Sequence, residues 1–150
     1  MTLPRPCYAP PALEICAIDA APSVRLPLFE STVPAGFPSP AEDYEEMRID
    51  LNQHLVRHPA ATFYARVHGH SMQEAHIHDG DLLVIDRALT ARENHVVVCI
   101  LDGAFTVKRL GSQHGQLCLL PAHPDYAPIP VSQYQDFCVW GVVTYVIHSC

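Results

Sequence analysis

Lysine is nearly absent from this sequence: Lys108 is the single lysine among 150 residues, beside eight arginines. The basic residues are scattered, and sixteen Asp and Glu bring the formal net charge to −7. A surface that grips nucleic acid by itself needs clustered Lys and Arg to neutralise phosphates. The charge therefore disfavours direct, sequence-specific binding to nucleic acid, and it leaves open why one position keeps a lysine.

Long apolar runs and paired cysteines are also missing. No apolar stretch approaches the roughly 20 residues that span a bilayer, and prolines interrupt residues 1–16, which lack the apolar core of a signal peptide. The six cysteines form no C-x-x-C pair, and Cys99, Cys118 and Cys138 lie in apolar, strand-like runs. We therefore expect a cytoplasmic protein without a membrane anchor, in which the cysteines are reduced core thiols rather than disulfides.

Proline is plentiful but unevenly placed. Nine of the fourteen prolines lie in residues 1–40, which excludes a long helix or an inner strand there. We expect residues 1–40 to form an extended, mobile, proline-rich arm. The hydrophobic content of 49% is enough for a buried core, so we expect residues 41–150 to form one domain.

The domain favours strands over helices. A short helix is predicted at residues 51–57, with Asp50 as its N-cap, Gln53 three residues on, and Pro59 limiting its length. Asp102-Gly103 between two apolar runs predicts a tight hairpin. The strand-like runs rich in β-branched and aromatic residues are 62–69, 81–89, 95–101, 104–110, 116–122 and 137–147. The predicted fold class is mostly β: a compact, strongly bent sheet or partial barrel.

Histidines form two H-x-H pairs, which raises the question of a metal site. His68 with His70, and His76 with His78, would each share one face of a strand, and imidazole is a good ligand for zinc or copper. No cysteine or fourth-ligand pattern completes a structural site, however, and the chain has ten histidines. Solvated or hydrogen-bonded histidines are the better interpretation, with a metal-binding module as the alternative. We expect neither a metal nor another cofactor.

Ser71 and Lys108 raise the question of catalysis. A serine hydroxyl is a poor nucleophile unless a base takes its proton, and a lysine can do so only when it is neutral. Neutrality near pH 7 requires removal of water from the amine. Lys108 lies in the strand-like run 104–110, so such a site is conceivable. From spacing alone, a lysine that faces outward from a half-buried strand is the better interpretation.

Five motifs in order change that balance. They are "AGFPSPAEDY" (35–44), "RIDLNQHLVRHPAATFY" (48–64), "GHSM" (69–72), "IHDGDLLVID" (77–86) and "VVVCILDGAFTVKRL" (96–110). With them the chain resembles the self-cleaving LexA/UmuD family of serine–lysine peptidases, of the S24 type, from residue 26 to residue 147. The resemblance to UmuD-like members is close. His70 departs from the acidic or apolar residue usual before the serine, and residues 1–25 match no part of the pattern.

The resemblance implies a set of site residues. Ser71 is expected to be the nucleophile and Lys108 the general base, with the backbone N–H groups of His70 and Ser71 holding the oxyanion. The scissile bond is expected between Ala35 and Gly36. Prolines at 34, 38 and 40 keep this stretch extended, as a protease substrate must be. By composition alone, the same stretch would be interpreted as a flexible linker.

The resemblance also implies a function in the SOS response to DNA damage. Repressors of this family carry a helix-turn-helix domain of about 60–80 residues before the cleavage site, and the 35 residues here are too few for one. We therefore expect a UmuD-like mutagenesis protein. Stimulated by a RecA filament on single-stranded DNA, it would cut itself, and the trimmed homodimer would serve a UmuC-like, error-prone Y-family polymerase in translesion synthesis. The alternative is a non-enzymatic dimeric scaffold of that polymerase with an unused dyad.

Overall fold

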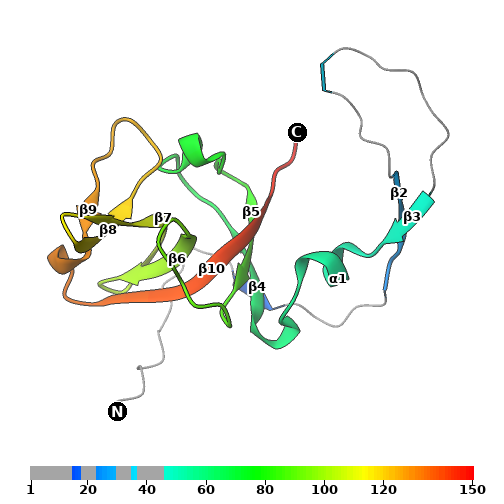
Figure 1. Cartoon of the computed structure of the whole chain (residues 1–150), viewed down its shortest axis with the longest axis horizontal. Coiled ribbons are helices and arrows are strands. Elements are labelled where there is room, and N and C mark those ends of the chain that lie inside the picture. The colour runs from blue at the N-terminus through cyan, green and yellow to red at the C-terminus, as the bar shows by residue number, and fades with distance from the viewer. Residues whose placement is uncertain (1–14, 18–22, 30–34, 37–45) are drawn as a thin grey trace. The chain divides into compact units, whose positions relative to one another are not determined.

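The computed structural model describes residues 15–17, 23–29, 35–36 and 46–150 (Figure 1). These residues belong to two compact units. The sheet unit contains residues 15–17 and 58–150, and the ribbon unit contains residues 23–29, 35–36 and 46–57. The boundary expected at residue 40 lies outside the described residues.

The sheet unit is built on one antiparallel sheet of eight strands, in the order β1-β4-β5-β10-β6-β7-β8-β9. Three short 3₁₀ turns, η1 (Pro59–Ala61), η2 (Gln73–Ala75) and η3 (Val131–Gln133), lie between strands. In its described part the sheet does not close into a barrel, and the predicted mostly β, strongly bent fold is confirmed. The strands are β1 (Ile15–Ala17), β4 (Thr62–Arg66), β5 (Leu82–Asp86), β6 (Val96–Leu101), β7 (Ala104–Gln113), β8 (Gln116–Leu120), β9 (Ile129–Pro130) and β10 (Phe137–Ile147).

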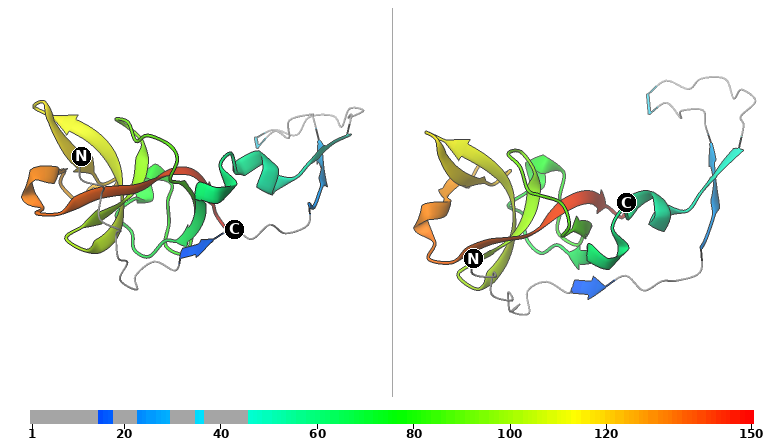
Figure 2. Two further views of the ribbon diagram at one scale, coloured as in Figure 1. Left: turned by 90° about the horizontal axis from the view of Figure 1, so that it is seen from below. Right: turned by 60° about the horizontal axis from the view of Figure 1, so that its bottom comes forward.

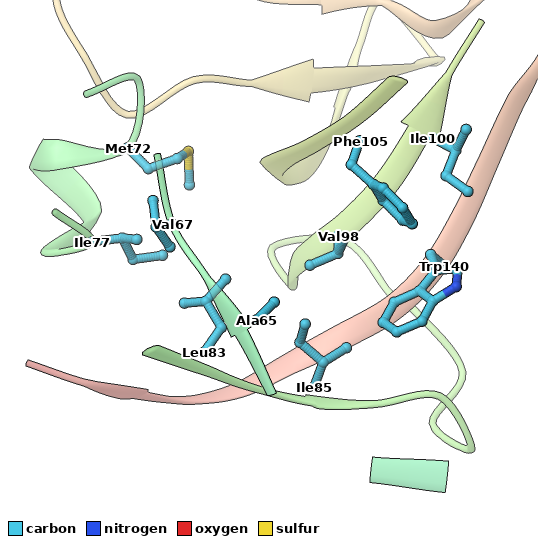
Figure 3. Close-up of a cluster of buried hydrophobic side chains, with 10 residues drawn as sticks. All are labelled: Ala65, Val67, Met72, Ile77, Leu83, Ile85, Val98, Ile100, Phe105 and Trp140. Atoms are coloured by element: carbon cyan, nitrogen blue, oxygen red, sulfur yellow. The ribbon is translucent and has the colours of Figure 1, made fainter. Parts of the chain in front are cut away.

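The bend of the sheet buries both of its faces. In β6, Val97 and Cys99 belong to one apolar cluster, whereas Val98 and Ile100 belong to another on the opposite face. Figure 3 shows the second cluster, in which side chains from five strands and from the loop after β4 converge. A strand buried on both faces reads as a continuous apolar run rather than an alternating one, which explains the sequence "VVVCIL".

Strand β10 lies between β5 and β6 and pairs with both of them (Figure 2). Its first half pairs with β6 and its second half with β5, with a register irregularity in each half. At Gly141 a side chain would not fit, because a Cβ there would lie 2.5 Å from Ile85 Cγ2. The absence of a side chain therefore lets β10 pass close to β5 where it changes partners.

The predicted hairpin is present between β6 and β7. Asp102 and Gly103 have φ of 45° and 86°, the left-handed pair that a two-residue type I′ turn requires. His114 and Gly115 make the same kind of turn between β7 and β8, with φ of 52° and 74°. The first turn sets the register that places Lys108 opposite Val97, and the second sets the register of β7 against β8.

The ribbon unit contains strands β2 (Leu26–Phe29) and β3 (Glu46–Ile49) and helix α1 (Leu51–Leu55). Asp50 is the N-cap as predicted, and its carboxylate accepts hydrogen bonds from the N–H groups of Asn52 and Gln53. The helix ends two residues earlier than predicted, because Val56 is already extended and Pro59 begins η1.

The described strands of the proline-rich region were not predicted. β1 forms an edge of the large sheet, and β2 pairs only with β3. Edge positions tolerate neighbouring prolines because one side of the strand needs no ladder hydrogen bonds. Cys99 and Cys118 are buried thiols in β6 and β8, as predicted, whereas Cys138 in β10 is only half-buried and Cys150 is exposed. No helix among the described residues is long and apolar enough to cross a membrane.

Candidate active site

Ser71 lies in the loop of residues 67–81, which joins β4 to β5. Two backbone hydrogen bonds close the base of this loop: Val67 N–H donates to Asp81 O at 2.9 Å, and Gly80 N–H donates to Val67 O at 2.8 Å. Gly69, with a φ of 102°, donates its N–H to Asp79 Oδ1 at 2.8 Å. Only glycine adopts such a φ readily, so the "HGHSM" stretch turns sharply just before the serine.

Asp81 also fixes the conformation of this loop. Its carboxylate is buried, accepts a hydrogen bond from His78 N–H at 2.8 Å, and lies 2.6 Å from His148 Nδ1. Burial alone would raise the pKa of Asp81, but the hydrogen bonds and the attraction of His78 and His148 outweigh it and lower that pKa. Asp81 therefore remains a carboxylate and keeps accepting these bonds at neutral pH.

Apolar anchors hold the loop against the sheet. Met72, which follows the serine, and Ile77 are almost fully buried in the cluster that Figure 3 shows, beside Val67. On the other side, Ser71 O accepts a hydrogen bond from Ala122 N–H at 2.9 Å. The backbone on both sides of the Ser71 hydroxyl is thus fixed before any substrate arrives.

Lys108 reaches Ser71 from strand β7. Its Nζ donates a hydrogen bond to Ser71 Oγ at 2.9 Å, although 37 residues separate the two in sequence. The lysine is only 8% exposed. The structure therefore brings together the two residues that the sequence singled out. Lys108 is buried, so the outward-facing orientation that spacing alone favoured is wrong.

The surroundings of Lys108 favour its neutral form. Burial lowers the pKa of the amine, and the nearby Cys99 acts weakly in the opposite direction. Burial also raises the pKa of the Cys99 thiol to about 12, so Cys99 stays uncharged and offers no counter-ion. A neutral Nζ carries a lone pair, and at 2.9 Å it is within reach of the serine proton.

A cleft of about 120 Å³ opens beside Ser71. Its lining is mainly apolar, and among the described residues no group accepts a hydrogen bond from the backbone N–H of His70, Ser71 or Met72. These donors remain available to a bound group. The cleft is lined by Val67, His68, Gly69, Ser71, Met72, Phe105, Thr106 and Val107.

The other predicted site residues are described within their own units. Ala35 and Gly36 are exposed and form a bend in the ribbon unit. His68 Nδ1 lies 3.7 Å from Asp79 Oδ1, and His70 Nδ1 lies 3.0 Å from Gln73 Nε2. In the described part of the chain, no three His, Cys, Asp or Glu side chains are arranged to hold a metal ion.

Sequence reasoning did not single out the loop of residues 121–128. Ala122 forms two hydrogen bonds with the serine loop, residues 67–81: one through its N–H and one through its O. Tyr126 lies near Lys108. The sequence "PAHPDYAP" signals a turn through its prolines, but nothing in it indicates which residues that turn contacts.

The sequence pattern of the Peptidase S24-like family matches residues 27–144. The chain belongs to this family. It is 46% identical over 123 residues to protein SamA of Salmonella typhimurium, covering 82% of this chain and 85% of SamA. It is 42% identical over 121 residues to protein MucA of Escherichia coli, covering 80% and 82%. The resemblance to UmuD-like S24 members is thereby confirmed.

A repressor also matches. The chain is 36% identical over 140 residues to the LexA repressor of Bordetella parapertussis, covering 87% of this chain but 64% of the repressor. Membership of the Peptidase S24-like family supports self-cleavage by a serine peptidase in general terms. The described strands and the serine loop lie largely within the matched residues.

Burial of Lys108 predicts a pH-dependent cost to stability. The folded-state pKa lies below the ordinary 10.5, so the unfolded chain binds more protons between these two values. Wild-type stability should rise with pH through that window. Lys108→Met keeps an apolar stem without the charge and should therefore be more stable than wild type near pH 7, with an advantage that shrinks as the pH approaches 10.5. Urea unfolding at a series of pH values measures the difference.

Lys108→Arg is the matched control for this series. Its guanidinium stays charged at every usable pH, so its deficit relative to Lys108→Met should persist at pH 10. A constant gap between wild type and Lys108→Met across the whole range would contradict a depressed lysine pKa.

Proposed function

We propose that this protein is a self-cleaving peptidase of SOS mutagenesis, in which Ser71 and Lys108 hydrolyse the chain's own Ala35–Gly36 bond. The observation that carries the proposal is the 2.9 Å hydrogen bond between Lys108 Nζ and Ser71 Oγ, with the lysine buried. A serine hydroxyl next to a neutral amine is an activated nucleophile, because the amine can take its proton. Membership of the S24-like family supports this chemistry.

The proposed reaction has two stages. Ser71 Oγ attacks the carbonyl carbon of Ala35 while its proton passes to Lys108 Nζ, and the resulting oxyanion accepts hydrogen bonds from the N–H groups of His70 and Ser71. When the C–N bond breaks, the Lys108 ammonium gives its proton to the nitrogen of Gly36. Water, deprotonated by the amine, then hydrolyses the ester on Ser71. The products are residues 1–35 and 36–150.

The cleft suits a small, extended substrate. Because its walls are mainly apolar and its volume is about 120 Å³, it admits little more than a few side-chain atoms. Ala35 and Gly36 carry one methyl group between them, and both are exposed. We therefore take this bond as the substrate, and residues 1–35 as the arm that its hydrolysis removes from the domain.

We further propose that the trimmed product is a homodimer that serves a UmuC-like Y-family polymerase in the cytoplasm, and that a RecA filament stimulates cleavage. Similarity to SamA, MucA and LexA supports this context. An apolar end of β10, where Tyr145, Val146 and Ile147 are exposed, supports the dimer. Sedimentation at micromolar concentration tests it, and a monomer alone would contradict it.

Purified protein at alkaline pH should release a fragment of residues 36–150, detected by intact mass. Below the pKa of Lys108 the rate should rise about tenfold per pH unit, since only the neutral amine acts as a base. Ser71→Ala and Lys108→Arg should lower the rate by about 10³-fold or more, the second because guanidinium does not deprotonate. Both variants should keep the wild-type circular dichroism spectrum.

Two outcomes of this assay would count against the mechanism. A Lys108→Arg variant that still cut itself would rule out Lys108 as the base. Intact wild-type protein at every pH, with and without RecA filaments, would instead favour a non-enzymatic scaffold with an unused dyad.

Substitutions at the scissile bond test its position independently of the dyad. Ala35→Trp and Gly36→Val should each stop cleavage by crowding the groove: the indole is too large for a cleft of about 120 Å³, and the branched Cβ of valine crowds the backbone at the scissile bond. Ser23→Ala, in the same unit but away from the bond, is the matched control and should cleave at the wild-type rate. Normal cleavage of both bulky variants would place the scissile bond elsewhere in the chain.

A further inference from the structure

An aromatic ring lies over the amine of Lys108. The Tyr126 ring centroid is 6.0 Å from Nζ, and the tyrosine itself is 55% exposed. One side of the ring thus faces the lysine while much of the residue remains in water. Tyr126 comes from the capping loop, residues 121–128, which runs from β8 towards β9 (Figure 1).

A tight turn places this ring. Tyr126 N–H donates to His123 O at 3.2 Å, which closes a four-residue turn with Pro124 at its second position, where the fixed φ of proline is favoured. Asp125 N–H donates to His123 Nδ1 at 3.1 Å. The His123 ring packs nearly perpendicular to Tyr126, with centroids 5.1 Å apart. The tyrosine is thus held by local structure and is not a loose surface side chain.

The capping loop is joined to the serine loop next to the dyad. Ala122 N–H donates to Ser71 O at 2.9 Å, and Ala122 O accepts from Glu74 N–H at 2.8 Å. Four residues further along the loop is Tyr126. The same segment therefore fixes the backbone of Ser71 and places the ring over Lys108, which couples the positions of the two reacting side chains.

Two opposing effects of the ring on Lys108 must be weighed. The π face attracts an ammonium, but 6.0 Å is the outer limit at which this attraction is significant, and exposure weakens it further. Covering the amine keeps water away from it, which disfavours the ammonium. In the described part of the chain, the titratable groups near Lys108 are the neutral thiol of Cys99 on β6 and Tyr126, whose ring contacts that of His123; Asp125 lies in the same turn. Exclusion of water is therefore the larger effect.

We propose that Tyr126 is a positioning residue whose ring closes the solvent side of Lys108 and holds the amine against Ser71. The role needs the face of the ring and not its hydroxyl group. It rests on the proposed function only in that the amine held in this way is the base for self-cleavage.

The single lysine makes the proposal directly measurable. Trace acetylation of intact protein over a range of pH, read by peptide mass spectrometry against the N-terminal amine, gives the titration midpoint of Lys108 without any need for cleavage. Tyr126→Ala should raise that midpoint by on the order of 0.5 pH unit, or about a threefold smaller neutral fraction at lower pH. Tyr126→Phe should leave it unchanged. Leu117→Ala, at an exposed side chain of β8 that takes no part in the site, is the control.

The other outcomes of the labelling experiment would overturn the proposal. An unchanged midpoint in Tyr126→Ala would mean that the ring does not shield the amine. A lower midpoint would mean that attraction to the ammonium dominates. A shift in Tyr126→Phe equal to that in Tyr126→Ala would assign the effect to the phenol hydroxyl.

Self-cleavage then separates this proposal from the function on which it rests. If the wild type cleaves, the pH profile of Tyr126→Ala should move upward by the same amount as its labelling midpoint. If the wild type does not cleave, the proposed function fails, yet the labelling result still decides whether Tyr126 positions Lys108. A cleavage profile that stays in place while the labelling midpoint moves would overturn Lys108 as the base and leave the shielding intact.

Discussion

The candidate active site depends on one contact, the hydrogen bond between Lys108 Nζ and Ser71 Oγ. An amine in this position must lose its hydration, and burial of a charge without a partner is costly. Within the described ranges no carboxylate pairs with the Lys108 amine, and its titratable neighbour on the sheet is the uncharged Cys99. The folding free energy of the sheet must therefore offset the cost of keeping the Lys108 amine out of water.

Three separate segments meet at this contact, and each is fixed by a different kind of interaction. Strand β7 is held by pairing with β6 and β8. The serine loop is held by Gly69, by the Asp79 and Asp81 carboxylates and by the buried Met72. The capping loop is held by Ala122. Because ladder hydrogen bonds, hydrogen bonds to carboxylates and apolar packing fail under different conditions, a single substitution outside the Ser71–Lys108 pair should loosen the site without dismantling it.

Sequence pattern predicted the strands of the sheet unit well because buried runs such as "VVVCIL" and the Asp-Gly and His-Gly turns are local signals. It also predicted the Asp50 cap. It missed β1, β2, β3 and β9, since a strand of two to four residues at an edge has little local signature. Likewise Ser71 and Lys108 were found through family motifs, whereas Tyr126 was not, because its importance comes from a contact across 18 residues of sequence, and no periodicity encodes such a contact.

The two units differ in a way that fits an enzyme acting on its own chain. Lys108 lies on a strand of the eight-stranded sheet, which is buried on both faces, and Ser71 lies in a loop anchored to that sheet, so the geometry that we propose to be catalytic is kept at little cost in side-chain freedom. The Ala35–Gly36 bond lies instead in a unit whose sheet has two strands, with Leu26, Leu28 and Met47 exposed. Two strands alone are marginally stable in water. A substrate must become extended before a peptidase can cut it, and a ribbon of low stability opposes that change only weakly.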